Sequence, residues 1–203
     1  MGAPNGYSGI VESLIPTLKK TVAALEERRI PYVLGGSIAC WAHGGSAIAA
    51  DLDFMIKPED ADRALVALVD SGMREERPPE QWLVKAWDGP VLVDLIYEPA
   101  GFPVTDDVIA RGRRLSVAAM RVWVMALEDV MTTKLMSLGE HSLDYEDPLQ
   151  IARSLRERID WAEVRSRTEG SPYANPFFTL LEALELTPRV EERELAKPRI
   201  RVA

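Results

Sequence analysis

The segment at residues 32–57 constrains the fold of this chain most strongly. Its landmarks, in order, are an apolar run, two glycines with a serine, and two aspartates at the start of a second apolar run: Tyr32-Val33-Leu34, Gly35, Gly36, Ser37, Asp51 and Asp53. A glycine pair directly after an apolar run is typical of a tight turn that ends a strand. The order predicts a strand, a glycine turn, a short helix, a loop and a second strand that begins with two carboxylates.

The two aspartates are expected to lie on the same face of their strand. Side chains alternate along a strand, so Asp51 and Asp53 are about 6.5 Å apart along the backbone, while Leu52 points into the core. Carboxylates this close repel each other unless a cation neutralises them, and Mg²⁺ prefers such oxygen ligands. The backbone N–H groups of a glycine turn at the start of a helix attract an anion. The segment therefore predicts that a metal ion and a phosphate meet at one place.

A third aspartate, Asp94, lies within the apolar run at residues 91–97. A charge in a buried strand is costly unless it is paired or bound to a metal. If this strand lies beside the one with the aspartate pair, Asp94 comes within about 5 Å of one of them. A second Asp-x-Asp, Asp60 and Asp62, lies in a predicted helix at 58–71, where residues two apart do not share a face. We expect that second pair to be a solvated surface pair.

The glycine turn, the aspartate pair and the later Asp94 resemble the signature of the DNA polymerase beta-like nucleotidyltransferase superfamily, and within it the small bacterial AbiEii-type proteins often tied to toxin–antitoxin systems. The resemblance covers residues 30–97, with a weaker likeness around Lys134. It implies two-metal transfer of a nucleoside monophosphate from a nucleoside triphosphate. Its expected site residues are Asp51, Asp53 and Asp94 as catalytic residues and Mg²⁺ ligands, with Asp94 as ligand or general base, and Gly35, Gly36, Ser37 and Lys134 as nucleotide-binding residues.

The resemblance and the periodicity together predict an α+β fold, in which helices flank a mixed β-sheet and a helical extension follows. Residues 82–85 and 91–97 read as a hairpin, because Asp88-Gly89 is a strong turn signal. The expected division is a nucleotidyltransferase-like core at 1–114 and a mostly helical part at 115–203. Helices are expected at 10–29, 126–138, from Pro148 to 155, at 159–169 and at 173–186, with Asp147 as the N-cap of the one that begins at Pro148.

Composition narrows the possible functions. With 203 residues, 47% of them hydrophobic and 28% charged, the chain has the composition of a soluble globular protein. A net charge of −8 argues against broad nonspecific binding to nucleic acids. The single cysteine, Cys40, is expected to be buried, and a reducing cytoplasm fits this cysteine usage. No apolar run is long enough to span a membrane.

Several alternatives stay open. The acceptor of the transferred group is an RNA such as tRNA, a protein or a small molecule. Because residues 46–50 lack a cation before the aspartate pair, a catalytically silent relative that binds a nucleotide or a partner as a regulator is the second possibility. Arg111, Arg113 and Arg114 form either a solvated loop or a contact for phosphate or RNA. His141 is either a general base or a solvated loop residue.

Overall fold

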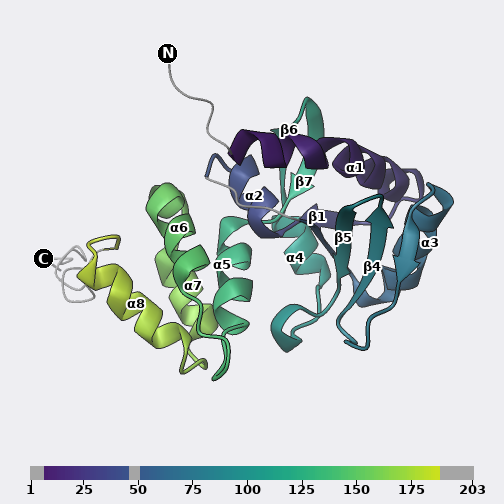
Figure 1. The fold of residues 1–203 in the computed structure, drawn as a ribbon. Coiled ribbons are helices and arrows are strands. Elements are labelled where there is room, and N and C mark those ends of the chain that lie inside the picture. Colours follow the sequence, from purple (N-terminus) through teal and green to yellow (C-terminus); the bar gives the residue numbers. More distant parts are fainter. Residues whose placement is uncertain (1–6, 46–50, 188–203) are drawn as a thin grey trace, which may run out of the picture.

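The structure, a computed structural model, describes residues 7–45 and 51–187 of the chain. These residues form one mixed seven-stranded sheet flanked by eight α-helices, which confirms the expected α+β class (Figure 1). The loop at 46–50 and the charged segment from residue 189 lie outside the described residues. Within the described ranges, no helix is both long enough and apolar enough to cross a membrane.

The sheet has the strand order β3-β4-β5-β2-β1-β7-β6. β2 is parallel to β5 and β1 is parallel to β7, and the other neighbouring strands are antiparallel. β4 and β5 form the predicted hairpin, in which Gly89 and Pro90 make the turn. The strands are β1 Tyr32–Leu34, β2 Asp51–Ile56, β3 Arg74–Glu76, β4 Leu83–Asp88, β5 Val91–Ile96, β6 Arg113–Val117 and β7 Met120–Val124.

The helices cover both faces of the sheet and extend to one side of it. The α-helices are α1 Tyr7–Glu27, α2 Gly36–Ala42, α3 Ala61–Asp70, α4 Asp106–Arg111, α5 Leu127–Met136, α6 Glu146–Leu155, α7 Trp161–Thr168 and α8 Ala174–Ala183. Three short 3₁₀ helices complete the described elements: Pro58–Asp60, Pro99–Gly101 and Arg156–Arg158.

The two faces of the sheet differ in their covering. α1 packs on the face that carries Tyr32 and Phe54, whose rings lie 5.5 Å apart, and α3 packs beside α1 against β3, β4 and β5. α2 lies on the opposite face and contacts α5. α7 packs against α5, and α8 against α7, so that α5–α8 gather at one side of the sheet (Figure 1). Alternation of apolar side chains along β2 produces this arrangement, because Leu52, Phe54 and Ile56 are all buried on one face.

The sheet continues beyond residue 114, where the boundary between the core and the helical part was expected. β6 spans this position, and its partner β7 pairs with β1 in the middle of the sheet. The periodicity argument overlooked β6, since its exposed Arg113 and Arg114 read as a loop. The division into a core and a helical part stays a proposal, and the structure favours a boundary between β7 and α5.

Two local expectations were wrong. Asp62 is exposed as expected, but Asp60 is buried, and the Arg63 guanidinium 2.5 Å from its carboxylate compensates the buried charge. α6 begins at Glu146, so Asp147 lies inside this helix and does not cap it. For Arg111 a solvated loop and a contact for phosphate or RNA had both stayed open; it belongs to α4, and its guanidinium binds a buried carboxylate.

That carboxylate, Asp129, holds three helices together. It lies on α5 with 1% of its side chain exposed, and it accepts two hydrogen bonds from Arg111 of α4, at 2.9 and 2.7 Å, and one from Arg167 of α7, at 2.5 Å. Two guanidinium groups around one buried carboxylate compensate the cost of its burial. The ionic cluster therefore joins the helical part to α4 beside the sheet.

Replacing the buried carboxylate by an amide tests this role. We expect Asp129→Asn to lower the free energy of unfolding by about 2 kcal/mol, because both guanidinium groups lose their ionic partner. Chemical denaturation measures the change. Asp62→Asn is the matched control, since the Asp62 side chain is 81% exposed in its pair with Arg77, and its effect should be close to zero. Equal effects of the two substitutions would contradict the role of Asp129.

Candidate active site

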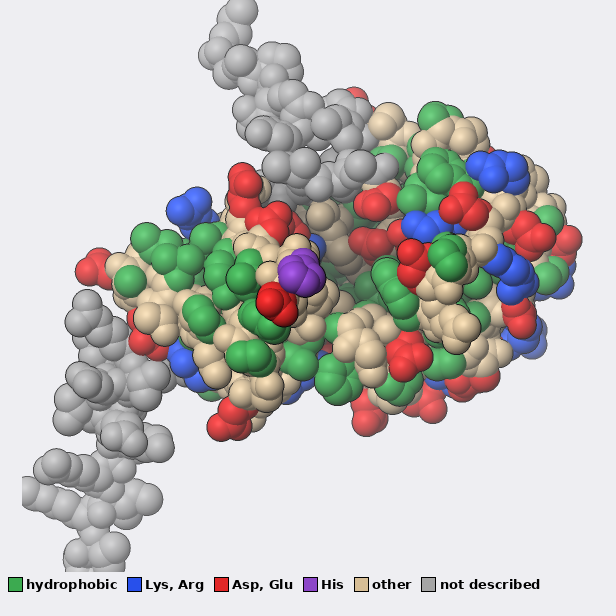
Figure 2. All heavy atoms as spheres, turned by 60° about the horizontal axis from the view of Figure 1, so that its bottom comes forward, with side chains coloured by type: hydrophobic (Ala, Val, Ile, Leu, Met, Phe, Trp, Pro, Cys, Tyr) green, Lys and Arg blue, Asp and Glu red, His purple; other side chains and the backbone are tan. Residues whose placement is uncertain are grey.

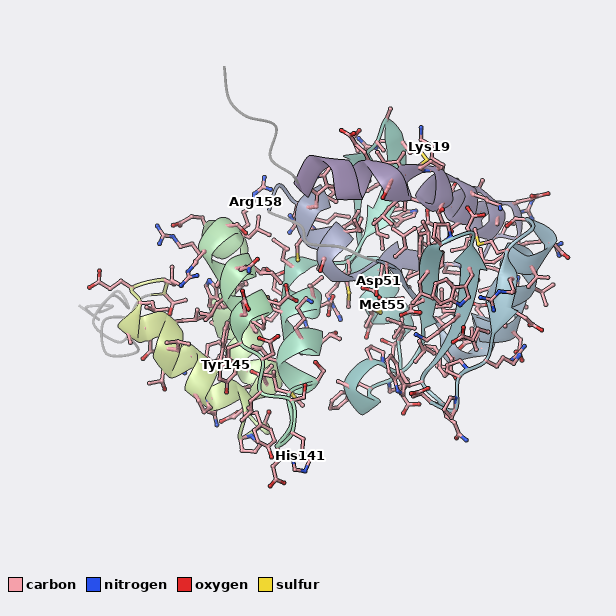
Figure 3. The ribbon with its side chains drawn as sticks, in the orientation of Figure 1. Lys19, Asp51, Met55, His141, Tyr145 and Arg158 are labelled. Atoms are coloured by element: carbon pink, nitrogen blue, oxygen red, sulfur yellow. The ribbon has the colours of Figure 1, made fainter. Side chains whose placement is uncertain are left out.

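Three aspartates from two neighbouring strands meet on one face of the sheet. Asp51 and Asp53 alternate along β2, and Asp94 of β5 lies directly opposite Asp53 in the parallel register. Each of the three offers a carboxylate oxygen, and these oxygens lie within 4.8 Å of one another. The structure therefore brings together the three aspartates that the sequence singles out. Figure 2 shows acidic side chains gathered in a hollow between the helical part and the sheet, and Figure 3 places Asp51 at the centre of the molecule.

The glycine corner makes room for one of these carboxylates. The Gly35 N–H donates a hydrogen bond of 2.8 Å to the Asp53 carbonyl, which continues the pairing of β1 with β2. Gly36 then starts α2 with a φ of +56°, and a Cβ at this position would lie 1.8 Å from Asp53 Oδ2. Only glycine fits there, on both steric and conformational grounds. The first turn of α2, including Ser37, leaves N–H groups without an intrahelical acceptor next to the aspartates.

Crowding of the carboxylates changes their acidity. Burial, reinforced by the charges of Asp51 and Asp94, raises the pKa of Asp53 to about 7, although Lys134 and Lys85 oppose the rise. Burial also raises the pKa of Asp94, while the nearby Lys85 ammonium lowers it. A metal-free site therefore favours a proton on one of the carboxylates at neutral pH.

Lys85 is a member of the site that the sequence analysis did not identify. It lies on β4 directly opposite Asp94, and its Nζ is 3.3 Å from Asp94 Oδ1. That buried oxygen still has no hydrogen bond of good geometry among the described residues. The signal was present in the hairpin, because a two-residue turn at Gly89 and Pro90 fixes the register that pairs residue 85 with residue 94.

Lys134 points from α5 toward the same region, but it is already engaged. Its ammonium binds the carboxylate of Asp147 on α6, and its charge also acts on Asp53. Asp147 was expected to serve as a helix cap and instead fixes this lysine. The predicted contact of Lys134 with a triphosphate remains a prediction.

Other singled-out residues lie outside this site. Figure 3 shows His141 on the loop at the lower end of the helical part, away from Asp51, and it is exposed. Cys40 is buried in α2 as expected, and burial raises the pKa of its thiol to about 12. Arg114 lies on β6 with its guanidinium 5.9 Å from the ring centroid of Trp123.

The residues present fit a hard divalent cation. Three carboxylates supply only oxygen ligands, one buried Asp94 oxygen has no hydrogen bond of good geometry, and burial together with the charges of Asp51 and Asp94 raises the pKa of Asp53 to about 7. A bound divalent cation would use these ligands, give the Asp94 oxygen a partner and neutralise the crowded carboxylates. Magnesium is the natural candidate where phosphate oxygens complete the coordination.

Solved structures share this fold. The antibiotic-resistance factor ANT(2'')-Ia in solution has a TM-score of 0.56 and 18% sequence identity, and the match covers 86% of this chain and 96% of that one. The crystal structure of ANT(2'')-Ia with adenylyl-2''-tobramycin has a TM-score of 0.51 and 17% sequence identity. This match covers 85% of this chain and 99% of that one. The Thermotoga maritima protein TM1012 has a TM-score of 0.50 and 18% sequence identity. This match covers 61% of this chain and 84% of that one. At these identities the likeness shows the fold alone.

A comparison of the sequence with protein-family models assigns the chain to a family. No curated protein matches the chain. A family model described as "Nucleotidyl transferase of unknown function (DUF2204)" matches residues 15–175, which include all three aspartates, the glycine corner and α5. The chain therefore belongs to the DUF2204 family of nucleotidyl transferases.

Proposed function

We propose that this protein is an active, metal-dependent nucleotidyltransferase, which moves a nucleoside monophosphate from a nucleoside triphosphate to a hydroxyl group of an acceptor. The observation that carries the proposal is the approach of three carboxylate oxygens within 4.8 Å of one another beside Gly36. Membership of the family and the shared fold support it. Such a cluster destabilises a protein unless it binds a cation, so its presence favours a bound metal ion, which this transfer requires.

The chain's residues have distinct proposed roles. Asp51, Asp53 and Asp94 hold Mg²⁺, which when bound neutralises charge on the transferring phosphoryl group. Gly36 and Ser37 present N–H groups to the phosphates that leave as pyrophosphate. Asp94, on the strand farther from the glycine corner, accepts the proton of the attacking hydroxyl as a new oxygen–phosphorus bond forms and the bond to pyrophosphate breaks.

The acceptor is the least determined part of the proposal. ANT(2'')-Ia was solved with adenylyl-2''-tobramycin, so one relative in fold carries an adenylylated small molecule. The resemblance to AbiEii-type proteins adds tRNA and protein as acceptors, within a toxin–antitoxin system. A pool of cellular RNA and extract therefore has to be tested beside small molecules.

A catalytically silent, nucleotide- or partner-binding regulator is the second candidate. The observation that favours it is the pairing of both nearby lysines with carboxylates, Lys85 with Asp94 and Lys134 with Asp147. A triphosphate needs cations, and here these two lysines already have partners. This alternative predicts binding of metal and nucleotide without transfer to any acceptor.

Label transfer separates the two candidates. We expect Mg²⁺ and one of the four α-labelled triphosphates to label a component of total RNA, cell extract or a small-molecule pool. Asp53→Asn should reduce this labelling by about 10³-fold, because a metal ligand is lost. Asp62→Asn, in the exposed second Asp-x-Asp, is the control and should label normally. Unchanged labelling by Asp53→Asn would reject the proposed site.

Metal binding should depend on pH around neutrality. With a pKa of about 7, Asp53 is mostly protonated at pH 6 and mostly ionised at pH 8. Since a ligand must be deprotonated, Mn²⁺ should bind about tenfold more weakly at pH 6 than at pH 8 by calorimetry. A pH-independent affinity would contradict a protonated Asp53.

Stability without metal should show the opposite dependence. The folded pKa of Asp53 lies above its ordinary value of 3.8, so the folded state binds more protons between pH 4 and 7. Stability in a chelator therefore falls as pH rises through this window. At pH 8, Asp53→Asn should raise the melting temperature in the chelator, and Mg²⁺ should stabilise only the wild type.

The glycine corner offers a test with a matched control. Gly36 and Gly89 have φ values of +56° and +60°, but a Cβ meets Asp53 only at Gly36, whereas nothing lies within 4 Å of it at Gly89. Both alanine variants should lose about 1 kcal/mol of stability from backbone strain. Only Gly36→Ala should also lose Mn²⁺ binding, measured by calorimetry, because its methyl group displaces the carboxylate. Intact Mn²⁺ binding by Gly36→Ala would count against the site.

A further inference from the structure

The aspartates belong to two rows of side chains that cross the sheet on the same face. In the first row the strand register aligns Glu76, Lys85, Asp94 and Asp53. In the second row it aligns Arg74, Trp87, Leu92 and Asp51. Each row runs from the edge strand β3 to β2, so the face of the β3–β4–β5 segment continues directly from the aspartates.

This part of the sheet face is open among the described residues. Lys85, Trp87 and Leu92 are partly exposed and Arg74 is exposed, whereas Val84 and Ala86, which point to the other face of β4, are 7% and 0% exposed. α3 covers that other face. A tryptophan, a lysine and an arginine therefore face solvent beside the aspartates.

The indole of Trp87 is held in a fixed orientation. Its Nε1 donates a hydrogen bond of 2.7 Å to Glu76 Oε2, and the Arg74 guanidinium lies over one side of the ring, 5.6 Å from its centroid, in a cation–π contact. No ion pair of Arg74 with another described residue is found, so its N–H groups are available to a ligand. A fixed aromatic ring with a free guanidinium beside it is suited to a ligand with a flat ring and an anionic group.

The direction of the proposed reaction places the acceptor on this side. In a displacement at phosphorus, the attacking and leaving oxygens lie on opposite sides of the transferred group. The proposed phosphate contacts, Gly36 and Ser37, lie on the β1 side of the aspartates, so the acceptor approaches from the β5 and β4 side. Trp87 lies two strands from Asp51, which is about 10 Å.

We propose that Trp87, Arg74 and Lys85 form the acceptor site, and that this site takes a nucleotide unit. The base stacks on Trp87, its phosphate meets Arg74, and Lys85 donates to a ribose oxygen next to the attacked hydroxyl. The net charge of −8 disfavours a long contact with RNA, so the site reads one terminal nucleotide. This inference rests on the proposed transferase function and names the acceptor class for it.

Fluorescence anisotropy tests the site without catalysis. The full chain is saturated with Mg²⁺ and α,β-methylene-ATP, whose bridging carbon prevents transfer, and titrated against a fluorescein-labelled RNA hexanucleotide with a free 3′ hydroxyl. Free AMP competes in a parallel series. Trp87→Ala should weaken RNA binding on the order of tenfold and leave the affinity for α,β-methylene-ATP unchanged, while Trp87→Phe should retain most of the binding.

Trp123 provides a matched control, since it is 42% exposed, lies beside Arg114 and belongs to β7, on the other side of β2 from Trp87. Trp123→Ala should bind RNA like the wild type. If thermal unfolding shows that the Trp87→Ala variant is not folded, the Arg74→Gln and Arg114→Gln variants are compared instead. Only Arg74→Gln is then expected to lose RNA binding.

The outcomes separate the two proposals. A wild type that binds neither α,β-methylene-ATP nor the α,β-methylene analogues of the other three triphosphates with Mg²⁺ contradicts the proposed function. A wild type that binds one of these analogues but neither RNA nor AMP overturns the acceptor site alone. An equal loss of RNA binding in the Trp87→Ala and Trp123→Ala variants has the same meaning. So does a Trp87→Ala variant that loses binding of the analogue instead of binding of RNA. Competition by AMP identifies a free nucleotide as the acceptor, and binding of RNA alone identifies an RNA end.

Discussion

Mutual repulsion of three carboxylates is the constraint on which the rest of the structure depends. The parallel pairing of β2 with β5 sets Asp53 opposite Asp94, and the glycine corner lets the Asp53 carboxylate approach the backbone where any side chain would block it. Lys85 only partly offsets the charge, because one Asp94 oxygen keeps no hydrogen bond of good geometry. The fold therefore stores an electrostatic strain that a divalent cation would relieve.

The surrounding elements make this strained arrangement tolerable. Tyr32 of β1 and Phe54 of β2 pack together on the sheet face that α1 covers, and the buried ionic cluster of Asp129 joins α4, α5 and α7. These contacts hold α5 and the sheet in place on either side of the hollow that contains the acidic side chains (Figure 2). Stability is thus supplied away from the site, while the site itself remains charged and open to ligands.

Much of this could be predicted because local chemistry and backbone geometry agree. Alternation placed Asp51 and Asp53 on one face, the Asp88-Gly89 turn predicted the β4–β5 hairpin, and the cost of a buried charge singled out Asp94. Long-range pairing was less accessible. The partner of Asp147, Lys134, lies on another helix that only the fold brings near, whereas the partner of Asp60, Arg63, is three residues away and was predictable from helical spacing. β6 escaped detection because an exposed edge strand lacks an apolar pattern. The position of Lys85 opposite Asp94 could have been predicted from the register of the β4–β5 hairpin.

The most direct measurement is a crystal structure with Mn²⁺ and α,β-methylene-ATP, examined by anomalous scattering. The account predicts a manganese ion within about 2 Å of one oxygen from each of Asp51, Asp53 and Asp94, with the phosphates at Gly36 and Ser37. Manganese bound by the nucleotide alone, with no ion among the three carboxylates, would contradict it.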